Sequence, residues 1–131
     1  MAALEKRLDV HQEAYYQWNK MLDLRFEENT ERRNFLFECQ EWYYNNCLFL
    51  DSKSRLEFKK CLNNIFNYKM YWHMWKESTK KTKEYDAANM TLKNTWAQIL
   101  KTGEIIAKGI DLDHERIDDF DKELSMDNST R

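Results

Sequence analysis

The sequence predicts an all-α fold, and three observations support that prediction. The chain has no proline and only two glycines, whereas sheets and tight hairpins need turn residues. Charged residues make up 34% of it, which together with the missing helix breakers favours long uninterrupted helices. Apolar and aromatic side chains recur every three or four residues, a spacing that gathers them on one side of a helix.

The first helix is expected over about residues 2–26. The residues expected to face the core form one line along the helix, which we call its seam. They lie four, three, four, three and four positions apart: Leu4, Leu8, His11, Tyr15, Trp18 and Leu22. At about 1.5 Å per residue such a helix is nearly 40 Å long, enough for one edge of a bundle. Residues 27–30 interrupt the pattern, and Thr30 can cap the following helix.

A second helix, over about residues 30–50, concentrates aromatic and thiol side chains. Two neighbouring lines of residues form one broad apolar stripe: Phe35, Cys39, Trp42 and Asn46 on the first, and Leu36, Tyr43, Cys47 and Leu50 on the second. A stripe of this width predicts packing against at least two other helices. Asn45 and Asn46 favour an end to this helix, and Asp51 or Ser52 is expected to cap the next one.

Helical spacing continues over about residues 52–76 and again over about residues 86–110. The seam residues of the two helices are Leu56, Phe58, Cys61, Leu62, Ile65, Phe66, Lys69 and Trp72, then Leu92, Trp96, Ile99, Gly103, Ile106 and Ile110. Residues 77–85 are polar and lack periodicity, so we expect a loop that ends at Asp86 or Asn89 as the next cap. Gly103 lies on the seam and indicates close approach of another helix, and Gly109 is a candidate C-terminal cap.

Charge divides the chain into a body and a tail. Residues 1–110 hold 18 Lys and Arg against 15 Asp and Glu, whereas residues 111–131 hold 3 against 8.

The connections between the expected helices look short, which is typical of up-down-up-down packing. We therefore predict an antiparallel four-helix bundle over residues 1–110. Residues 111–131 are expected to form a short C-terminal helix or a loose acidic tail, with its last half-dozen residues disordered.

Part of the chain resembles a known family. The segments that carry the resemblance are LEKRLDVHQEAYYQW (4–18), ECQEWYYNNCLFLD (38–51) and residues 55–58, near the start of the next expected helix. They are similar to a family of small helical bacterial proteins of no known function. In that family two tryptophans usually precede Asn-Cys-Leu-aromatic-Leu; here Trp42 and Tyr43 take their place and Phe49 is the aromatic. The resemblance implies a helical fold and a bacterial or prophage origin, and it implies no catalytic residue.

The residue types needed for catalysis or metal binding do not fall into the required patterns. None of the three histidines has a Glu three residues before it, as a di-iron bundle would need. We interpret His11 as a hydrogen-bonded core residue, and His73 and His114 as structural or solvated. The cysteines Cys39, Cys47 and Cys61 form no close pair and are expected to be reduced packing groups. No phosphate-loop, dinucleotide, zinc-protease or hydrolase motif is present. We therefore expect neither an enzyme nor a cofactor.

One segment suggests nucleic-acid binding. Between residues 69 and 83, basic side chains alternate with aromatic ones: Lys69, Lys76, Lys80, Lys81 and Lys83 beside Tyr71, Trp72 and Trp75. In a nucleic-acid-binding protein, the lysines of such a segment would attract phosphates and its aromatic rings would stack on bases. The competing interpretation is that the tryptophans are core and the lysines solvate a helix end. A net charge of −2 favours the second interpretation, because nucleic-acid binders are usually strongly basic.

The leading hypothesis rests on the excess of aromatic residues. Several of them cannot fit on the apolar stripes, and surface aromatics are enriched in protein interfaces. The candidate protein-binding residues are Tyr43, Tyr44, Tyr71 and Trp75. We predict a protein-binding helical module, with a foreign partner or a second copy of the chain. Because no segment approaches the apolar length of a membrane span, the protein is expected to be soluble and cytoplasmic.

Overall fold

The computed structural model describes residues 2–27 and 29–129, and the all-α prediction is confirmed for them. Four α-helices follow one another: α1 (Ala2–Leu24), α2 (Thr30–Asn46), α3 (Ser52–Glu77) and α4 (Lys83–Ser129). A short 3-10 helix, η1 (Cys47–Phe49), lies between α2 and α3. None of the described helices carries an apolar stretch of the length that crossing a membrane requires.

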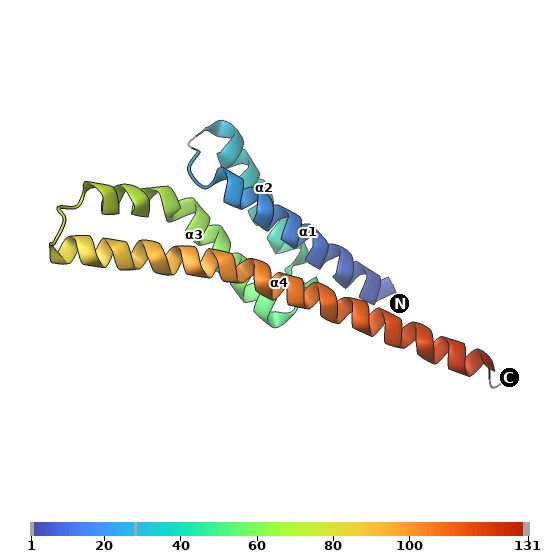
Figure 1. Ribbon diagram of the computed structural model, residues 1–131. Coiled ribbons are helices and arrows are strands. Elements are labelled where there is room, and N and C mark those ends of the chain that lie inside the picture. The colour runs from blue at the N-terminus through green and yellow to red at the C-terminus, as the bar shows by residue number, and fades with distance from the viewer. Residues whose placement is uncertain (1, 28, 130–131) are drawn as a thin grey trace.

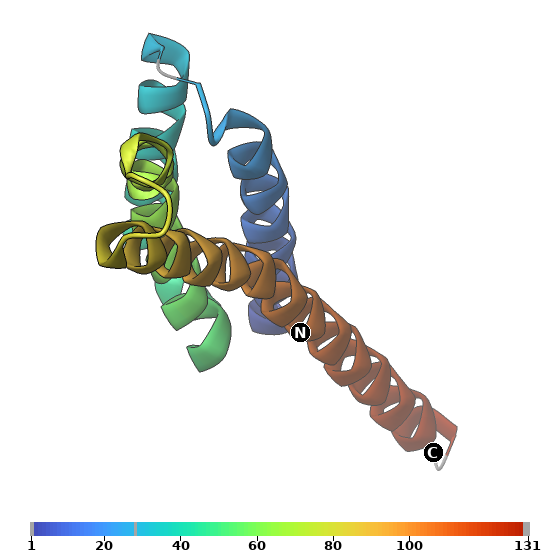
Figure 2. The ribbon, with the colours of Figure 1, turned by 60° about the vertical axis from the view of Figure 1, so that its left-hand side comes forward.

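The helices form an elongated molecule organised around α4. α3 returns along the first half of α4 as an antiparallel partner, and α1 crosses the middle of α4 (Figures 1 and 2). α4 makes most of the contacts between helices, with α3 and with α1, whereas α2 makes few. The α3–α4 loop forms one end of the molecule and the last turns of α4 form the other. This arrangement does not confirm a regular bundle in which four helices pack along their whole lengths.

The helix starts show which of the expected caps are used. Asp51 caps α3 as predicted, because its side chain accepts a hydrogen bond from the Ser54 N–H at 2.8 Å. The prediction for α2 was wrong by one residue: Asn29, not Thr30, accepts from the Arg32 N–H. α4 begins at Lys83, before the expected caps, where the Thr82 hydroxyl accepts from the Tyr85 N–H at 3.1 Å.

The hydrophobic core lies where α1, α2, α3 and α4 come together. Its fully buried members include Met21, Leu36, Phe58, Ile65, Ile99 and Ile106. Gly103 makes the predicted close approach possible, although its neighbour is a side chain: an added Cβ would lie 2.4 Å from the Trp18 ring. The Trp18 indole N–H donates to the Ile99 carbonyl at 2.7 Å, which fixes this contact.

The C-terminal part of the chain differs from the prediction. α4 continues past residue 110 without a break and extends to Ser129, so there is no separate short helix and no loose tail over residues 111–129. Residues 130–131 of the expected disordered end lie outside the described residues. Gly109 is therefore not a C-terminal cap; it lies inside α4, and no described glycine has a positive φ. The helix continues because neither proline nor glycine follows Gly109.

Candidate functional site

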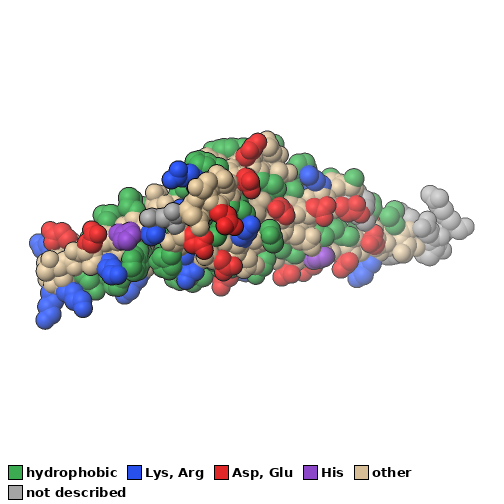
Figure 3. Space-filling model, turned by 90° about the horizontal axis from the view of Figure 1, so that it is seen from above, with side chains coloured by type: hydrophobic (Ala, Val, Ile, Leu, Met, Phe, Trp, Pro, Cys, Tyr) green, Lys and Arg blue, Asp and Glu red, His purple; other side chains and the backbone are tan. Residues whose placement is uncertain are grey.

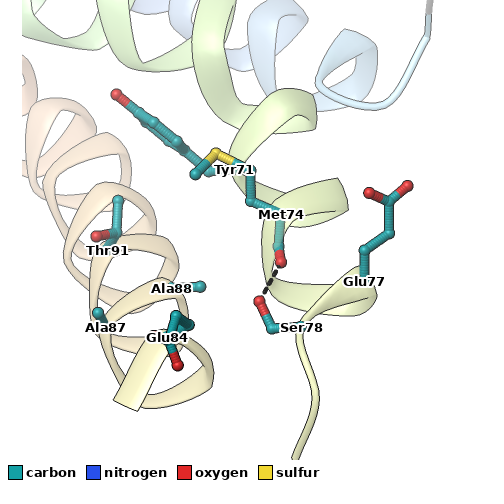
Figure 4. Close-up of a pocket in the computed structure, with 8 residues that line it drawn as sticks. All are labelled: Tyr71, Met74, Glu77, Ser78, Glu84, Ala87, Ala88 and Thr91. Carbon is teal, nitrogen blue, oxygen red and sulfur yellow. Dashed lines mark hydrogen bonds between the residues drawn. The ribbon is translucent and has the colours of Figure 1, made fainter. Parts of the chain in front are cut away.

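A groove near the α3–α4 loop is the first candidate site, and we name it the tip groove. Its volume is about 610 Å³, and it is lined by Tyr71, Met74, Glu77, Ser78, Glu84, Ala87, Ala88 and Thr91. Figure 4 shows Tyr71 and Met74 projecting from α3, and two alanines and Thr91 facing them from α4. The exposed surface of the lining is mostly apolar, and its two charged residues are Glu77 and Glu84; Figure 4 shows the Glu77 carboxylate pointing away from α4.

The connection between the two helices holds the groove open. Ser78 ends α3, since its hydroxyl donates to the Met74 carbonyl at 2.5 Å and its N–H to the Trp75 carbonyl at 3.3 Å. Lys81 then adopts a positive φ of 68°, which is uncommon outside glycine and typical of tight turns. Thr82 starts α4 directly afterwards. This short reversal places the small side chains of Ala87 and Ala88 opposite the end of α3.

Exposed methionines surround this end of the molecule. Met74, in the groove, is 55% exposed; Met70 and Met90, outside its lining, are 52% and 60% exposed. Methionine is flexible and polarisable, and it is frequent at surfaces that adapt to different partners. The tip therefore combines an apolar groove with adaptable apolar side chains around it.

The structure does not bring the four predicted protein-binding residues together. Tyr71 lines the tip groove, and Trp75 is half-buried against Tyr85, with ring centroids 6.2 Å apart. Tyr44 is 62% exposed but lies on α2. Tyr43 is only 6% exposed, because its ring stacks on Phe58 and its hydroxyl donates to the Arg55 carbonyl. The prediction that Tyr43 lies at the surface was therefore wrong.

The predicted nucleic-acid residues do lie at the tip, where Figure 3 shows lysines gathered at the end of the molecule. Lys80, Lys81 and Lys83 are exposed. Lys69 is half-buried and engaged within the protein. The Lys76 ammonium lies 4.6 Å from the centroid of the Trp72 ring, a cation–π distance. Lys76 and Trp72 thus contact each other and are not fully available to a nucleic acid, whereas the three loop lysines are exposed.

The acidic end of the chain cannot cover these lysines within one molecule. Lys83 and Asp111 are separated by 28 positions of one continuous helix, which corresponds to about 42 Å at 1.5 Å per residue. Figure 1 accordingly places the C-terminus at the opposite end from the α3–α4 loop. The acidic end therefore cannot shield the lysines near residue 80 of its own chain, as a loose tail could have done.

A second groove lies between the start of α3 and the middle of α4, and we name it the lysine groove. Its volume is about 710 Å³, and it is lined by Asp51, Ser52, Lys53, Leu56, Glu57, Lys101, Ile105, Lys108, Gly109 and Leu112. The apolar side chains include Leu56, 54% exposed, and Leu112, 40% exposed. This surface therefore combines three lysines with an apolar strip.

Behind the lysine groove lies a buried cluster of His11, Asp51 and Asp113, which we name the histidine cluster. The His11 Nδ1 hydrogen-bonds the Arg7 carbonyl at 2.8 Å and lies equally close to Asp113 Oδ2. The His11 Nε2 lies 3.0 Å from Asp51 Oδ2. Burial raises the pKa of Asp51, but hydrogen bonds from the Ser54 N–H and hydroxyl and from His11 outweigh it, so this pKa is lowered overall.

The histidine cluster connects three parts of the fold. His11 belongs to α1, Asp51 caps α3 and Asp113 belongs to α4, and both His11 and Asp113 are almost completely buried. Gly109 makes room for the cluster, since an added Cβ would lie 2.5 Å from Asp51 Oδ2 and 2.7 Å from His11 Cδ2. The prediction of a hydrogen-bonded core histidine is confirmed. Because the imidazole is shielded from solvent, we interpret this cluster as a structural connection.

Sequence reasoning missed the partners of His11. One signal was available for Asp113: it continues the line of Ile106 and Ile110 at a spacing of three, so the helical pattern already places this carboxylate on the buried side of α4. The contact with Asp51 had no such signal, because the two residues are 40 positions apart.

Comparisons of the chain with protein-family models, with curated proteins and with solved structures found no match. The resemblance of residues 4–58 to a bacterial family therefore stays an expectation. Function has to be argued from the surfaces of the molecule itself.

Proposed function

We propose that this protein is a non-enzymatic, cytoplasmic interaction module of bacterial or phage origin that binds a partner protein through the tip groove. The observation that supports this proposal is the groove itself, an open and mostly apolar channel between two antiparallel helices. Amphipathic helices commonly bind other proteins by laying their apolar face into a groove of this kind. Tyr71 and Met74 would supply the principal apolar contacts.

The charges of the lining favour one kind of partner. The two charged residues of the groove lining, Glu77 and Glu84, are both acidic, with the Glu77 carboxylate turned outward, away from α4. The nearby lysines are not part of the lining, and Lys76 folds over Trp72 instead. A complementary partner is therefore a helix with an apolar stripe bordered by Lys or Arg, since opposite charges at the rim set orientation and suppress wrong partners.

A binding experiment with one variant and one matched control tests this proposal. The probe is a synthetic amphipathic helix with a leucine stripe and lysine flanks, and the signals are the methionine methyl resonances. Met74→Lys should weaken binding at least about tenfold, because it removes an apolar contact and adds a repulsive charge. Met70→Lys, on the same helix but outside the lining, should leave binding unchanged. Equal effects of both variants would refute a specific role for the groove.

Nucleic-acid binding is the alternative, favoured by the exposed Lys80, Lys81 and Lys83 of the α3–α4 loop. If these lysines contact phosphates, replacing all three with glutamine should flatten the dependence of affinity on salt by about three units of slope, at nearly one unit per contact. A single-stranded oligonucleotide is the probe. Absence of binding at physiological salt would remove this alternative and leave the protein-binding proposal intact.

A further inference from the structure

The lining of the lysine groove would complement a surface that is both acidic and apolar. Its two carboxylates are already engaged inside the protein. Asp51 accepts hydrogen bonds from Ser54 and lies beside His11. Glu57 accepts a hydrogen bond from the Gln98 side chain at 2.9 Å and lies 3.7 Å from Lys60. The charges that remain at the solvent side are those of Lys53, Lys101 and Lys108, which are all exposed.

The other end of α4 has complementary chemistry. Beyond the groove, this helix carries a series of exposed carboxylates: Asp111, Glu115, Asp118, Asp119, Asp121 and Glu123. The basic groups nearby are fewer, and Arg116 turns back toward its own Asp113 at 3.8 Å. Figure 1 shows that these last turns of α4 project beyond the rest of the molecule. An acidic helix end that projects from the rest of the described chain thus follows directly after a basic groove.

We infer that a second copy of this chain binds the lysine groove, with its α4 antiparallel to the first and a two-fold axis near Leu112. In that register Lys101, eleven residues before Leu112, lies opposite Glu123, eleven residues after it in the second copy. Lys108 lies opposite Arg116, whose guanidinium is directed toward its own Asp113, and within one turn of Glu115 and Asp119. Each copy supplies both a basic groove and an acidic end, as an isologous contact requires.

The occupant cannot come from the same chain. Lys101 and Glu123 belong to one uninterrupted helix, so they lie about 33 Å apart along its axis. An antiparallel second helix brings the two kinds of charge together twice, in one closed contact. At the axis Leu112 would meet its counterpart from the second copy, and Leu56 and Ile105 extend the apolar strip on each side. This inference uses a different surface from the tip groove and does not depend on it.

A charge exchange between two full-length variants tests the pairing. The first variant, Lys101→Glu with Lys108→Glu, has an acidic groove and an acidic end; the second, Asp119→Lys with Glu123→Lys, has a basic groove and a basic end. All four side chains are exposed, so both variants should keep the helical circular dichroism of the wild type. Each variant alone should self-associate at least about tenfold more weakly than the wild type, and an equimolar mixture should recover the dimer.

Light scattering after size exclusion, together with native mass spectrometry of the mixture, gives the outcome. A wild type that stays at the 16.1 kDa mass of one chain at high micromolar concentration overturns the inference. So does a mixture that fails to form the heterodimer while each variant remains helical. Met74→Lys should leave the dimer unchanged, so failure of the tip-groove proposal and failure of the dimer are distinguished.

Discussion

Gly109→Ala provides the most direct test of the histidine cluster. In an ordinary helix interior this substitution stabilises, because alanine gains about 1 kcal/mol over glycine. Here the new Cβ would lie 2.5 Å from Asp51 Oδ2 and 2.7 Å from His11 Cδ2. Both are shorter than any normal contact, and neither group is free to rotate away. His11 is fully buried, and Asp51 is held by Ser54.

The expected loss of stability follows from the contact that the added methyl group would break. Separating His11 from Asp51 breaks a contact of 3.0 Å in which one partner is a carboxylate, and hydrogen bonds to charged groups contribute about 1.5 to 3 kcal/mol. A buried imidazole left without its partner costs about another 1 to 3 kcal/mol. After the gain in helix propensity is subtracted, Gly109→Ala should lower the free energy of unfolding by about 2 kcal/mol or more.

Urea unfolding followed by far-UV circular dichroism measures this change. Ala97→Gly, at an exposed position of α4, is the control and should cost about 1 kcal/mol through helix propensity alone. Gly109→Asn separates the two roles considered for this glycine. Asparagine is tolerated at a C-terminal cap but would be larger than alanine against His11. Stabilisation of the protein by Gly109→Ala would refute the close packing that we describe.

Three further predictions concern the core and the cluster. Trp42 is half-buried and packs on Phe58 at 5.6 Å between ring centroids, so Trp42→Ala should cost about 2 to 3 kcal/mol in urea unfolding, below the 3 to 5 kcal/mol of a fully buried tryptophan; a loss under about 1 kcal/mol would place this ring at the surface. Burial raises the pKa of Cys39 and of Cys61 to about 12, so a thiol reagent at neutral pH should modify Cys47 first, as peptide mapping can show, and equal labelling of all three would contradict the core. The lowered pKa of Asp51 stabilises the fold above pH about 4, and that contribution disappears as acid protonates the carboxylate. The stability difference between wild type and Asp51→Asn should therefore shrink on acidification below that pH, whereas a constant difference would mean that the charge has no part in it.

Local rules explain what could be predicted from the sequence. The helices of residues 2–77 follow from apolar spacing and from the scarcity of glycine and proline. Asp51 was identifiable as a cap because an aspartate before a helical pattern accepts from the first free N–H groups. His11 was identifiable as a core residue from its place on the seam between Leu8 and Tyr15. Each of these inferences needs only residues that are neighbours in the chain.

The predictions that failed depend on contacts between residues that are far apart in the sequence. Trp42 and Tyr43 both lie on the broad stripe of α2 and both pack on Phe58 of α3, and only the assembled fold leaves Tyr43 6% exposed and Trp42 half-buried. The tip groove likewise needs the alignment of α3 with α4, which brings Met74 opposite Ala88. The aromatic excess pointed to Tyr43 as a surface residue incorrectly, since composition does not specify which aromatic side chains the packed helices bury. Tyr71 lines the tip groove and stays a candidate protein-binding residue.

The acidic end of α4 shows how one error about local structure changes a functional argument. As a loose segment, residues 111–131 could have folded back and neutralised the lysines near residue 80. As part of a helix that extends from Lys83 to Ser129, the same carboxylates are held in fixed positions around the last turns of that helix, far from those lysines. Exposed charges farther apart than a Debye length of about 8 Å are largely screened at physiological salt, so the two ends of one molecule exert little attraction on each other. The loop lysines therefore do not neutralise the acidic end of their own chain, and in the antiparallel pair that we infer the basic surface opposite this end is the lysine groove of the second copy.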